Sequence, residues 1–131
     1  MIGAALLLAQ AAPFPPADWS ALPDLPLPPV NANVDLSAYV RREVAAKRCQ
    51  AVAVNGRTLQ VAAPVAVLLD EKGSLQRIVP QAIGCPTVEQ YTVGYVSTLV
   101  RRRLTGAGAL KPGWYRHTVT FRWTIDRKSV V

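Results

Sequence analysis

The stretch Tyr115-Arg-His-Thr-Val-Thr-Phe-Arg-Trp-Thr-Ile125 decides the fold. Apolar and aromatic side chains alternate in it with Arg and Thr, and this period of two is typical of a half-buried β-strand. One set of side chains therefore faces a core and the other faces solvent, which requires a sheet that is covered on one face only. The core-facing set includes His117, and the polar set is Arg116, Thr118, Thr120, Arg122 and Thr124.

A hairpin and two helices are expected upstream of this strand. Residues 63–69 are a short apolar, β-branched run, the sequence Asp70-Glu-Lys-Gly73 is typical of a turn, and residues 75–79 have strand propensity, which together predict a β-hairpin. Apolar residues recur at helical spacing in residues 36–47 and 88–104, with Asp35 and Thr87 as expected N-caps. The order helix, strand, strand, helix, strand predicts an α+β fold, in which two helices cover one face of a small antiparallel three-stranded sheet.

The prolines divide the chain. Seven of the 11 lie between Pro13 and Pro29, where the fixed φ and the missing N–H groups disfavour helix and sheet alike. We predict a partly ordered, extended Pro-rich linker over residues 12–33, a domain over residues 34–126 and a tail over residues 127–131. The linker also carries apolar residues that are able to dock on the domain or on a partner, namely Trp19, Leu22, Leu25 and Leu27.

The first residues indicate export. Residues 1–12 form a short apolar run that closes on the small-residue pattern Ala9-Gln-Ala11, which predicts a signal-peptide-like segment over residues 1–11 with cleavage after Ala11. The alternative is an ordinary apolar N-terminus, because no basic residue precedes the run. No stretch approaches the roughly 20 apolar residues of a spanning helix, so we expect no transmembrane span.

Cys49 and Cys85 are the only cysteines of the chain. In an exported protein they can form one intramolecular disulfide, which we rank ahead of two buried thiols and far ahead of a catalytic cysteine. No His or Lys adjoins Cys85 to activate it. Two cysteines and one histidine leave too few ligands for a structural zinc site, and we expect no metal and no cofactor.

The sequence gives little support to catalysis. His117 is the single histidine. No serine stands in a nucleophile elbow, and the sequence has no Gly-rich phosphate loop. We therefore predict that the protein is not an enzyme and has no small-molecule substrate. An enzyme centred on His117 is the third-ranked alternative.

The charge distribution indicates an alternative function. All 15 basic residues lie at or beyond Arg41, so residues 34–131, with six acidic residues, carry a net charge of +9. Such a domain is attracted to anionic surfaces. The alternative function is therefore a module that binds nucleic acid or anionic envelope polymers through Arg101, Arg102 and Arg103, at the expected end of the second helix. Export would remove most nucleic-acid partners, so nucleic acid is the less favoured ligand.

Residues 65–79, 87–104 and 111–124 together resemble the C-terminal domain of the TonB family of periplasmic energy transducers. The resemblance is carried by the hairpin turn Asp70-x-x-Gly73, the helix after Thr87, and Lys111-Pro-Gly113 before the last strand. It implies a periplasmic, non-enzymatic module with a protein or peptide partner in the cell envelope, linked to TonB-dependent transport. The chain departs from the family pattern at Val88-Glu89, where Leu-Asp is usual, and in lacking a Tyr-Pro pair before the first strand. Residues 1–12 are also too short for the family's membrane anchor.

We expect binding to occur by strand addition. An edge strand offers unpaired N–H and C=O groups to an extended peptide, and the side chains beside them set selectivity. The expected docking edge is the terminal strand, and the expected partner-binding residues are Arg116, Thr118, Thr120, Arg122 and Thr124.

Overall fold

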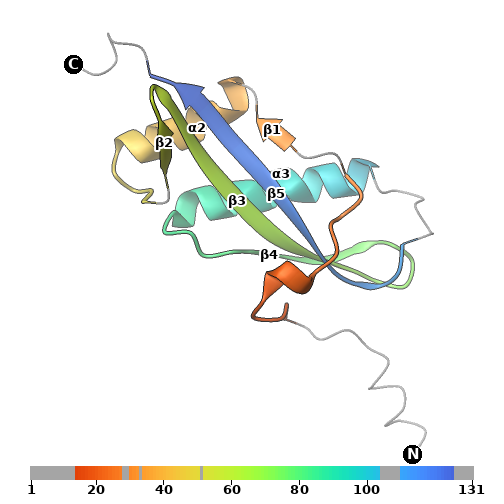
Figure 1. The fold of residues 1–131 in the computed structure, drawn as a ribbon. Coiled ribbons are helices and arrows are strands. Elements are labelled where there is room, and N and C mark those ends of the chain that lie inside the picture. Colours follow the sequence, from red (N-terminus) through yellow and green to blue (C-terminus); the bar gives the residue numbers. More distant parts are fainter. Residues whose placement is uncertain (1–13, 28–29, 33, 51, 104–109, 126–131) are drawn as a thin grey trace, which may run out of the picture.

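Figure 1 shows the computed structural model of the chain, which describes residues 14–27, 30–32, 34–50, 52–103 and 110–125. The predicted signal-like segment and the C-terminal tail lie outside these residues. In chain order the elements are a 3-10 turn η1 (Trp19–Ala21), strand β1 (Val30–Ala32), helix α2 (Val34–Ala45), strands β2 (Ala53–Asn55), β3 (Thr58–Leu69) and β4 (Leu75–Pro80), helix α3 (Pro86–Arg103) and strand β5 (Gly113–Thr124).

The sheet is built around two long strands, β3 and β5. They pair antiparallel over their full length, from Thr58 opposite Thr124 to Leu69 opposite Gly113. On its other side β3 pairs with β2 at one end and with β4 at the other, both antiparallel. Strand β1 pairs with the outer side of β5 in the parallel direction. The predicted α+β class is confirmed, and the short strands β1 and β2 extend the three expected strands to five.

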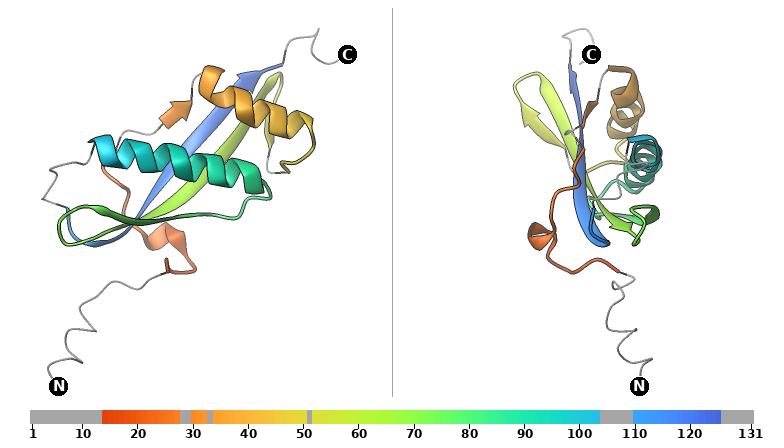
Figure 2. Two further views of the ribbon diagram at one scale, coloured as in Figure 1. Left: turned by 180° about the vertical axis from the view of Figure 1, so that it is seen from behind. Right: turned by 90° about the vertical axis from the view of Figure 1, so that its right-hand side faces the viewer.

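Both helices lie on the same face of this sheet, as the two views of Figure 2 show. The alternation along β5 explains this arrangement, because Tyr115, His117, Val119, Phe121 and Trp123 are all buried while Thr118, Arg122 and Thr124 are exposed. The helices add fully buried valines to the same core, including Val40 from α2 and Val88 and Val96 from α3. The prediction that one face of the strand meets a core is confirmed.

The helices begin slightly earlier than the sequence indicates. Helix α2 starts at Val34, so Asp35 lies within its first turn, and α3 starts at Pro86, one residue before the expected cap Thr87. Proline is favoured in a first helical turn because its missing N–H is not needed there. The capping function falls to Glu89, whose Oε2 accepts hydrogen bonds of 3.1 Å from the N–H groups of Ile83 and Cys85.

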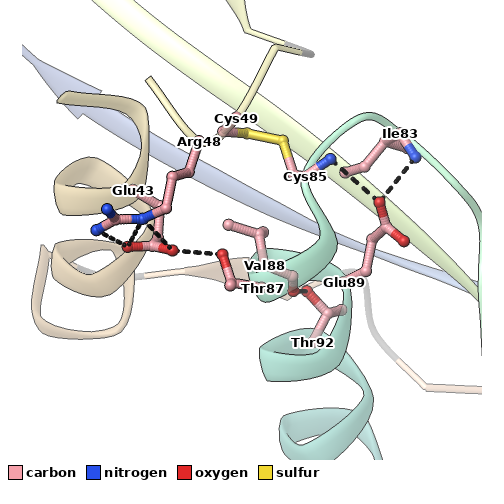
Figure 3. Close-up of a disulfide and its surroundings, with 9 residues drawn as sticks. All are labelled: Glu43, Arg48, Cys49, Ile83, Cys85, Thr87, Val88, Glu89 and Thr92. Carbon is pink, nitrogen blue, oxygen red and sulfur yellow. Dashed lines mark hydrogen bonds and ion pairs between the residues drawn. A yellow bond between two sulfur atoms is a disulfide. The ribbon is translucent and has the colours of Figure 1, made fainter. Parts of the chain in front are cut away.

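The disulfide between Cys49 and Cys85 is formed, and it joins the chain after α2 to the residue before α3 (Figure 3). Cys85 is fully buried and Cys49 nearly so. The predicted pairing is therefore confirmed. Because its two residues are 36 positions apart, the bridge fixes the ends of the two helices to each other in a way that local sequence contacts cannot.

The Pro-rich segment is not an extended tether where the structure describes it. Residues 14–27 run along the domain, and η1 lies on the face of the sheet opposite the two helices (Figure 2). There Leu22 is buried in a second small cluster with Ala66, Leu68 and Trp114. The expectation that prolines exclude pairing with the sheet is wrong at two points, since Asp24 forms a bridge with Arg116 and Val30–Ala32 form β1. Both contacts are made by residues other than proline, which retain the backbone N–H that proline lacks.

Candidate functional site: the outer edge of the terminal strand

The backbone of β5 presents one row of polar groups away from β3. The N–H of Arg116 donates to the C=O of Pro23 (2.9 Å) and the C=O of Arg116 accepts from the N–H of Leu25 (2.8 Å), whereas the N–H of Ile125 donates to Arg57 beside β3 (2.7 Å). Backbone groups alternate along a strand. The N–H and C=O groups of the even-numbered residues, from Arg116 to Thr124, therefore point toward the outer edge.

The predicted partner-binding residues are the same five even-numbered residues. Their side chains lie on the helix-free face of the sheet, where Thr118, Arg122 and Thr124 are exposed and Arg116 and Thr120 are half-buried. Two of them already have partners there. The guanidinium of Arg122 donates to Gln60 Oε1 (2.7 and 3.1 Å), and that of Arg116 pairs with the carboxylate of Asp24 (2.8 Å). The side chains of all five residues thus lie in one row along β5.

The same edge is not open along its whole length, which corrects the expectation of an exposed edge. Arg116 is bridged to Asp24, and residues 119–121 pair with β1. The N–H of Arg122 donates to the buried hydroxyl of Ser37 on α2 (3.4 Å). Thr118 lies between the two paired stretches and has no bridge to another strand on this side among the described residues.

A tight turn in the N-terminal segment explains the gap at Thr118. The N–H of Leu27 donates to the C=O of Leu25 (2.7 Å), a three-residue turn that takes the chain off the ladder after one bridge. Asp24 is the partner of Arg116 and Asn31 is the partner of Thr120, so the segment advances by seven positions where β5 advances by four. The segment pairs with Arg116 and Thr120, and among the described residues it forms no bridge with the stretch between them.

The docked segment is held mainly by two leucines. Leu25 is 2% exposed and belongs to the main core, and Leu22 is 9% exposed in the cluster on the opposite face. Full burial of such side chains stabilises docking by about 1.5–3 kcal/mol each, whereas the Asp24–Arg116 pair, exposed by 79% and 40%, adds at most about 1 kcal/mol. The loss of backbone entropy on ordering the segment opposes docking.

A cleft of about 660 Å³ separates this segment from the sheet. Its lining residues come from both sides, namely Trp19, Ser20, Asp24, Leu25, Leu27, Pro64, Gln81, Arg116, His117 and Thr118. The lining combines apolar side chains with a cation and several hydrogen-bonding groups. It therefore offers contacts that suit an amphipathic peptide.

His117 lies at the floor of this region and is 6% exposed. Burial lowers its pKa from the ordinary 6.5, and the negative charge of Asp24 opposes this shift more weakly. Its Nε2 atom is buried without a hydrogen-bond partner among the described residues. The lowered pKa favours the neutral imidazole at neutral pH.

The second possible docking edge, that of β4, is less suitable. Gln81 donates its N–H to the C=O of Pro64 on β3 (3.0 Å), and Val79 pairs with Ala66. Because backbone groups alternate along a strand, the backbone groups of Ile78 and Pro80 point away from β3. Pro80 has no N–H to offer, and a proline at such a position protects an edge against strand addition.

The remaining candidate groups do not gather into a site. Arg101 and Arg102 are exposed in the last turn of α3, and the side chain of Arg103 lies outside the described residues. Binding of anionic polymers through this triplet stays a prediction. Within the described ranges no group of three or more His, Cys, Asp and Glu is placed to hold a metal ion, and no helix is long and apolar enough to cross a membrane.

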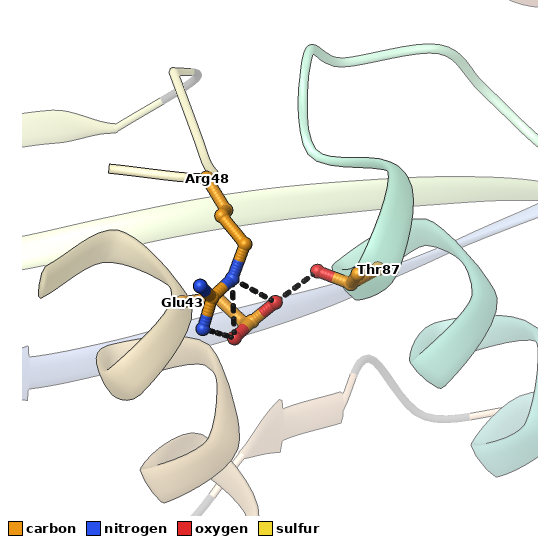
Figure 4. Close-up of polar contacts among 3 residues, drawn as sticks. All are labelled: Glu43, Arg48 and Thr87. Carbon is orange, nitrogen blue, oxygen red and sulfur yellow. Dashed lines mark hydrogen bonds and ion pairs between the residues drawn. The ribbon is translucent and has the colours of Figure 1, made fainter. Parts of the chain in front are cut away.

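The most buried carboxylate of the described residues has a structural explanation. Glu43 on α2 is 5% exposed and accepts hydrogen bonds from Arg48, at 2.9 Å from Nη2, and from the hydroxyl of Thr87 on α3 (Figure 4). Those hydrogen bonds lower its pKa from the ordinary 4.5. Lys47 adopts a left-handed φ of 61°, which ends α2 and turns the chain so that Arg48 reaches back to Glu43. The contact links the two helices beside the disulfide.

Of three residues that shape the edge, sequence reasoning missed Asp24 and Ser37, whereas Leu25 was among the apolar residues expected to be able to dock. Asp24 and Leu25 dock on β5, and Ser37 reaches the N–H of Arg122 from α2. The leucines between the prolines were the only available signal for the first two. A helical serine carries no signal of its own, because its role depends on where α2 packs.

Comparison with known proteins adds no identity. No protein family, curated protein or solved structure matches the chain.

Proposed function

We propose that this protein is an exported, non-enzymatic interaction module of the TonB C-terminal type, which binds an extended segment of a cell-envelope protein as a strand added to β5. The observation that carries the proposal is the outward row of backbone groups between Arg116 and Thr124, to which the chain adds its own residues in the parallel direction. An edge that accepts an extended segment in cis has the geometry to accept one in trans.

Two further features support this function. Among the residues with outward groups on β5 none is proline, so each carries an N–H for a ladder, in contrast to β4 with Pro80. The disulfide Cys49–Cys85 supports an exported protein, because such bridges form and persist in oxidising compartments. The proposed site for the first contact is the stretch from Trp114 to Thr118, next to the cleft.

The test uses peptides selected from a random displayed library against the full chain. Each selected peptide is then titrated by fluorescence anisotropy into three proteins, the unchanged chain, Thr118→Pro and Thr118→Ala. The proline removes an N–H that points away from β3 and so leaves the β3–β5 ladder intact. Thr118→Ala keeps that N–H and removes only the exposed side chain. We expect Thr118→Pro to lose at least ten-fold in affinity and Thr118→Ala to bind nearly as the unchanged chain does.

The salt dependence of the binding affinity distinguishes strand addition from the alternative function, which is binding of anionic polymers. Strand addition should weaken only modestly between 50 and 200 mM salt, whereas neutralisation of several phosphates would reduce affinity by roughly 10³–10⁵. Peptides that bind Thr118→Pro as tightly as the unchanged chain would show that β5 is not the docking edge. Ile78→Pro, which removes an outward N–H of β4, would then test the edge of β4.

A further inference from the structure

Residues 23–25 lie on β5 as a bound peptide would. Both backbone groups of Arg116 are used, one by the C=O of Pro23 and the other by the N–H of Leu25, and the residue between them, Asp24, is the parallel partner of Arg116. This is the full hydrogen-bond pattern of one position in a parallel ladder. The contact therefore defines which residue of an added strand faces Arg116.

The side chains at this position have a definite chemistry. Asp24 places its carboxylate 2.8 Å from Nε of Arg116 at the surface. Leu25, the next residue, points the other way and is 2% exposed in the core beside α2 and α3. An acidic residue followed by a leucine thus satisfies both faces of the β5 edge at this position, one with charge and one with apolar burial.

The chain's own segment is a poorer strand than the edge can accept. Its turn at Leu27 leaves Thr118 without a bridge on this side in the described structure, and Pro23 and Pro26 lack N–H groups. A peptide without these prolines could continue the ladder from Arg116 to Thr118 and keep the same acidic and apolar contacts. It would keep the backbone and side-chain contacts of residues 23–25 with Arg116 and the core and add at least one more.

We propose that residues 18–27 are an intramolecular competitor, which occupies the β5 edge until a partner peptide displaces it. The partner is an extended segment of another protein that runs parallel to β5, with Asp or Glu opposite Arg116 and Leu at the following position. This inference rests on the proposed function, since it assumes that β5 is the docking edge, and it specifies the partner and the state of the free protein. Occupation by a cis segment lowers the apparent affinity for the partner by the fraction of molecules that are open.

The first experiment measures release of the competitor. The probe is a fluorescein-labelled synthetic peptide, Thr-Val-Asp-Leu-Thr-Val-Thr-Lys, titrated into the full chain and into Leu25→Ala by anisotropy. We expect Leu25→Ala to bind the probe at least ten-fold more tightly, because the variant loses the main apolar contact of its own segment. Leu59→Ala is the matched control, since Leu59 is 8% exposed on β3 and lies outside the segment. It should bind the probe as the unchanged chain does.

The second experiment tests the partner chemistry and does not depend on Leu25. The ratio of affinities for the Asp probe and for a probe with Lys in its place is measured in the unchanged chain and in Arg116→Glu. We expect the unchanged chain to prefer Asp by about three- to five-fold and Arg116→Glu to prefer Lys by a similar factor. Release of the cis segment affects both probes equally, so it cancels in the ratio.

The outcomes distinguish the two proposals. Equal probe affinity in the unchanged chain and Leu25→Ala, or an unchanged ratio in Arg116→Glu, would overturn the inference of a competitor with this chemistry. If library peptides still bound in a Thr118→Pro-sensitive manner, the proposed function would stand without it. A concentration-dependent dimer, detected by light scattering and abolished by Leu25→Ala, would assign the edge to a second copy of the chain and also overturn the inference.

Discussion

Reduction of the Cys49–Cys85 disulfide should remove a large part of the stability of this domain. The bridge joins the chain after α2 to the start of α3, and both cysteines are buried between these helices and the sheet. Beside the bridge, the hydroxyl of Thr87 on α3 donates a hydrogen bond to the carboxylate of Glu43 on α2. Without the covalent bond, the unfolded chain gains the freedom of the whole intervening loop.

The expected magnitude follows from the length of that loop. Its ends are 36 residues apart, and closing a loop of this length costs an unfolded chain about 13 cal/mol/K, or about 4 kcal/mol at 25 °C, in the chain-entropy account. Small domains have a total stability of about 5–15 kcal/mol. The reduced protein should therefore lose between about a quarter and about four-fifths of its stability.

The assay is urea unfolding followed by Trp fluorescence, with and without reductant. With a slope of about 2 kcal/mol per M, the loss corresponds to a midpoint lower by about 2 M. The double variant Cys49→Ala/Cys85→Ala is the control, and its midpoint should not respond to reductant. Overlapping curves for the oxidised and reduced unchanged protein would refute the reasoning, because they would mean that the bridge does not constrain the unfolded state.

Three further predictions concern the core, a buried carboxylate and the basic triplet. Phe121→Ala should reduce the free energy of unfolding by about 3–5 kcal/mol, because the ring is fully buried and packs 6.0 Å from that of Tyr91, whereas Thr124→Ala at an exposed position should be nearly silent in the same urea titration. Glu43 has a folded-state pKa below its unfolded value of 4.5, so its contribution should be fully present above pH 4.5 and be lost as the pH falls through the folded-state pKa. Unfolding midpoints measured between pH 3 and 7 should accordingly fall less steeply at the acid end in Glu43→Gln than in the unchanged chain. Conversion of Arg101, Arg102 and Arg103 to Gln should change stability by no more than about 1 kcal/mol, and a larger loss in thermal unfolding would place one of them in a buried ion pair.

Local patterns were sufficient for most of the elements. The alternation around Phe121 predicted a one-sided strand, and the turn sequence Asp70-Glu-Lys-Gly73 predicted the β3–β4 hairpin; both elements are present. Strand β2 also carries a local signal, since Gly56-Arg57 joins the paired residues Asn55 and Thr58, and glycine at the first position of a two-residue hairpin loop accommodates a φ of 62°. Both helices start two residues before the expected positions 36 and 88, within the usual disagreement about helix ends.

The occupied edge of β5 could not be predicted in the same way. A proline-rich composition describes the average behaviour of a segment, whereas docking depends on single residues such as Asp24 and Leu25 meeting Arg116 and the core. Thr118 and Thr120, two residues apart, necessarily direct their N–H groups to the same side. Which side that is became clear only from the bonds of Arg116 with Pro23 and Leu25.

The sequence by itself determined the class of fold, the face of each strand that is buried and the only possible disulfide, because periodicity and cysteine count are properties of the chain alone. The tertiary structure decided which edge of the sheet is covered, and by what. Asp24 and Arg116 are 92 positions apart, and no local pattern records a contact between residues so distant. Such a contact forms only when the packing of the two leucines outweighs the entropy of ordering the segment, and that balance exists only once the sheet is assembled.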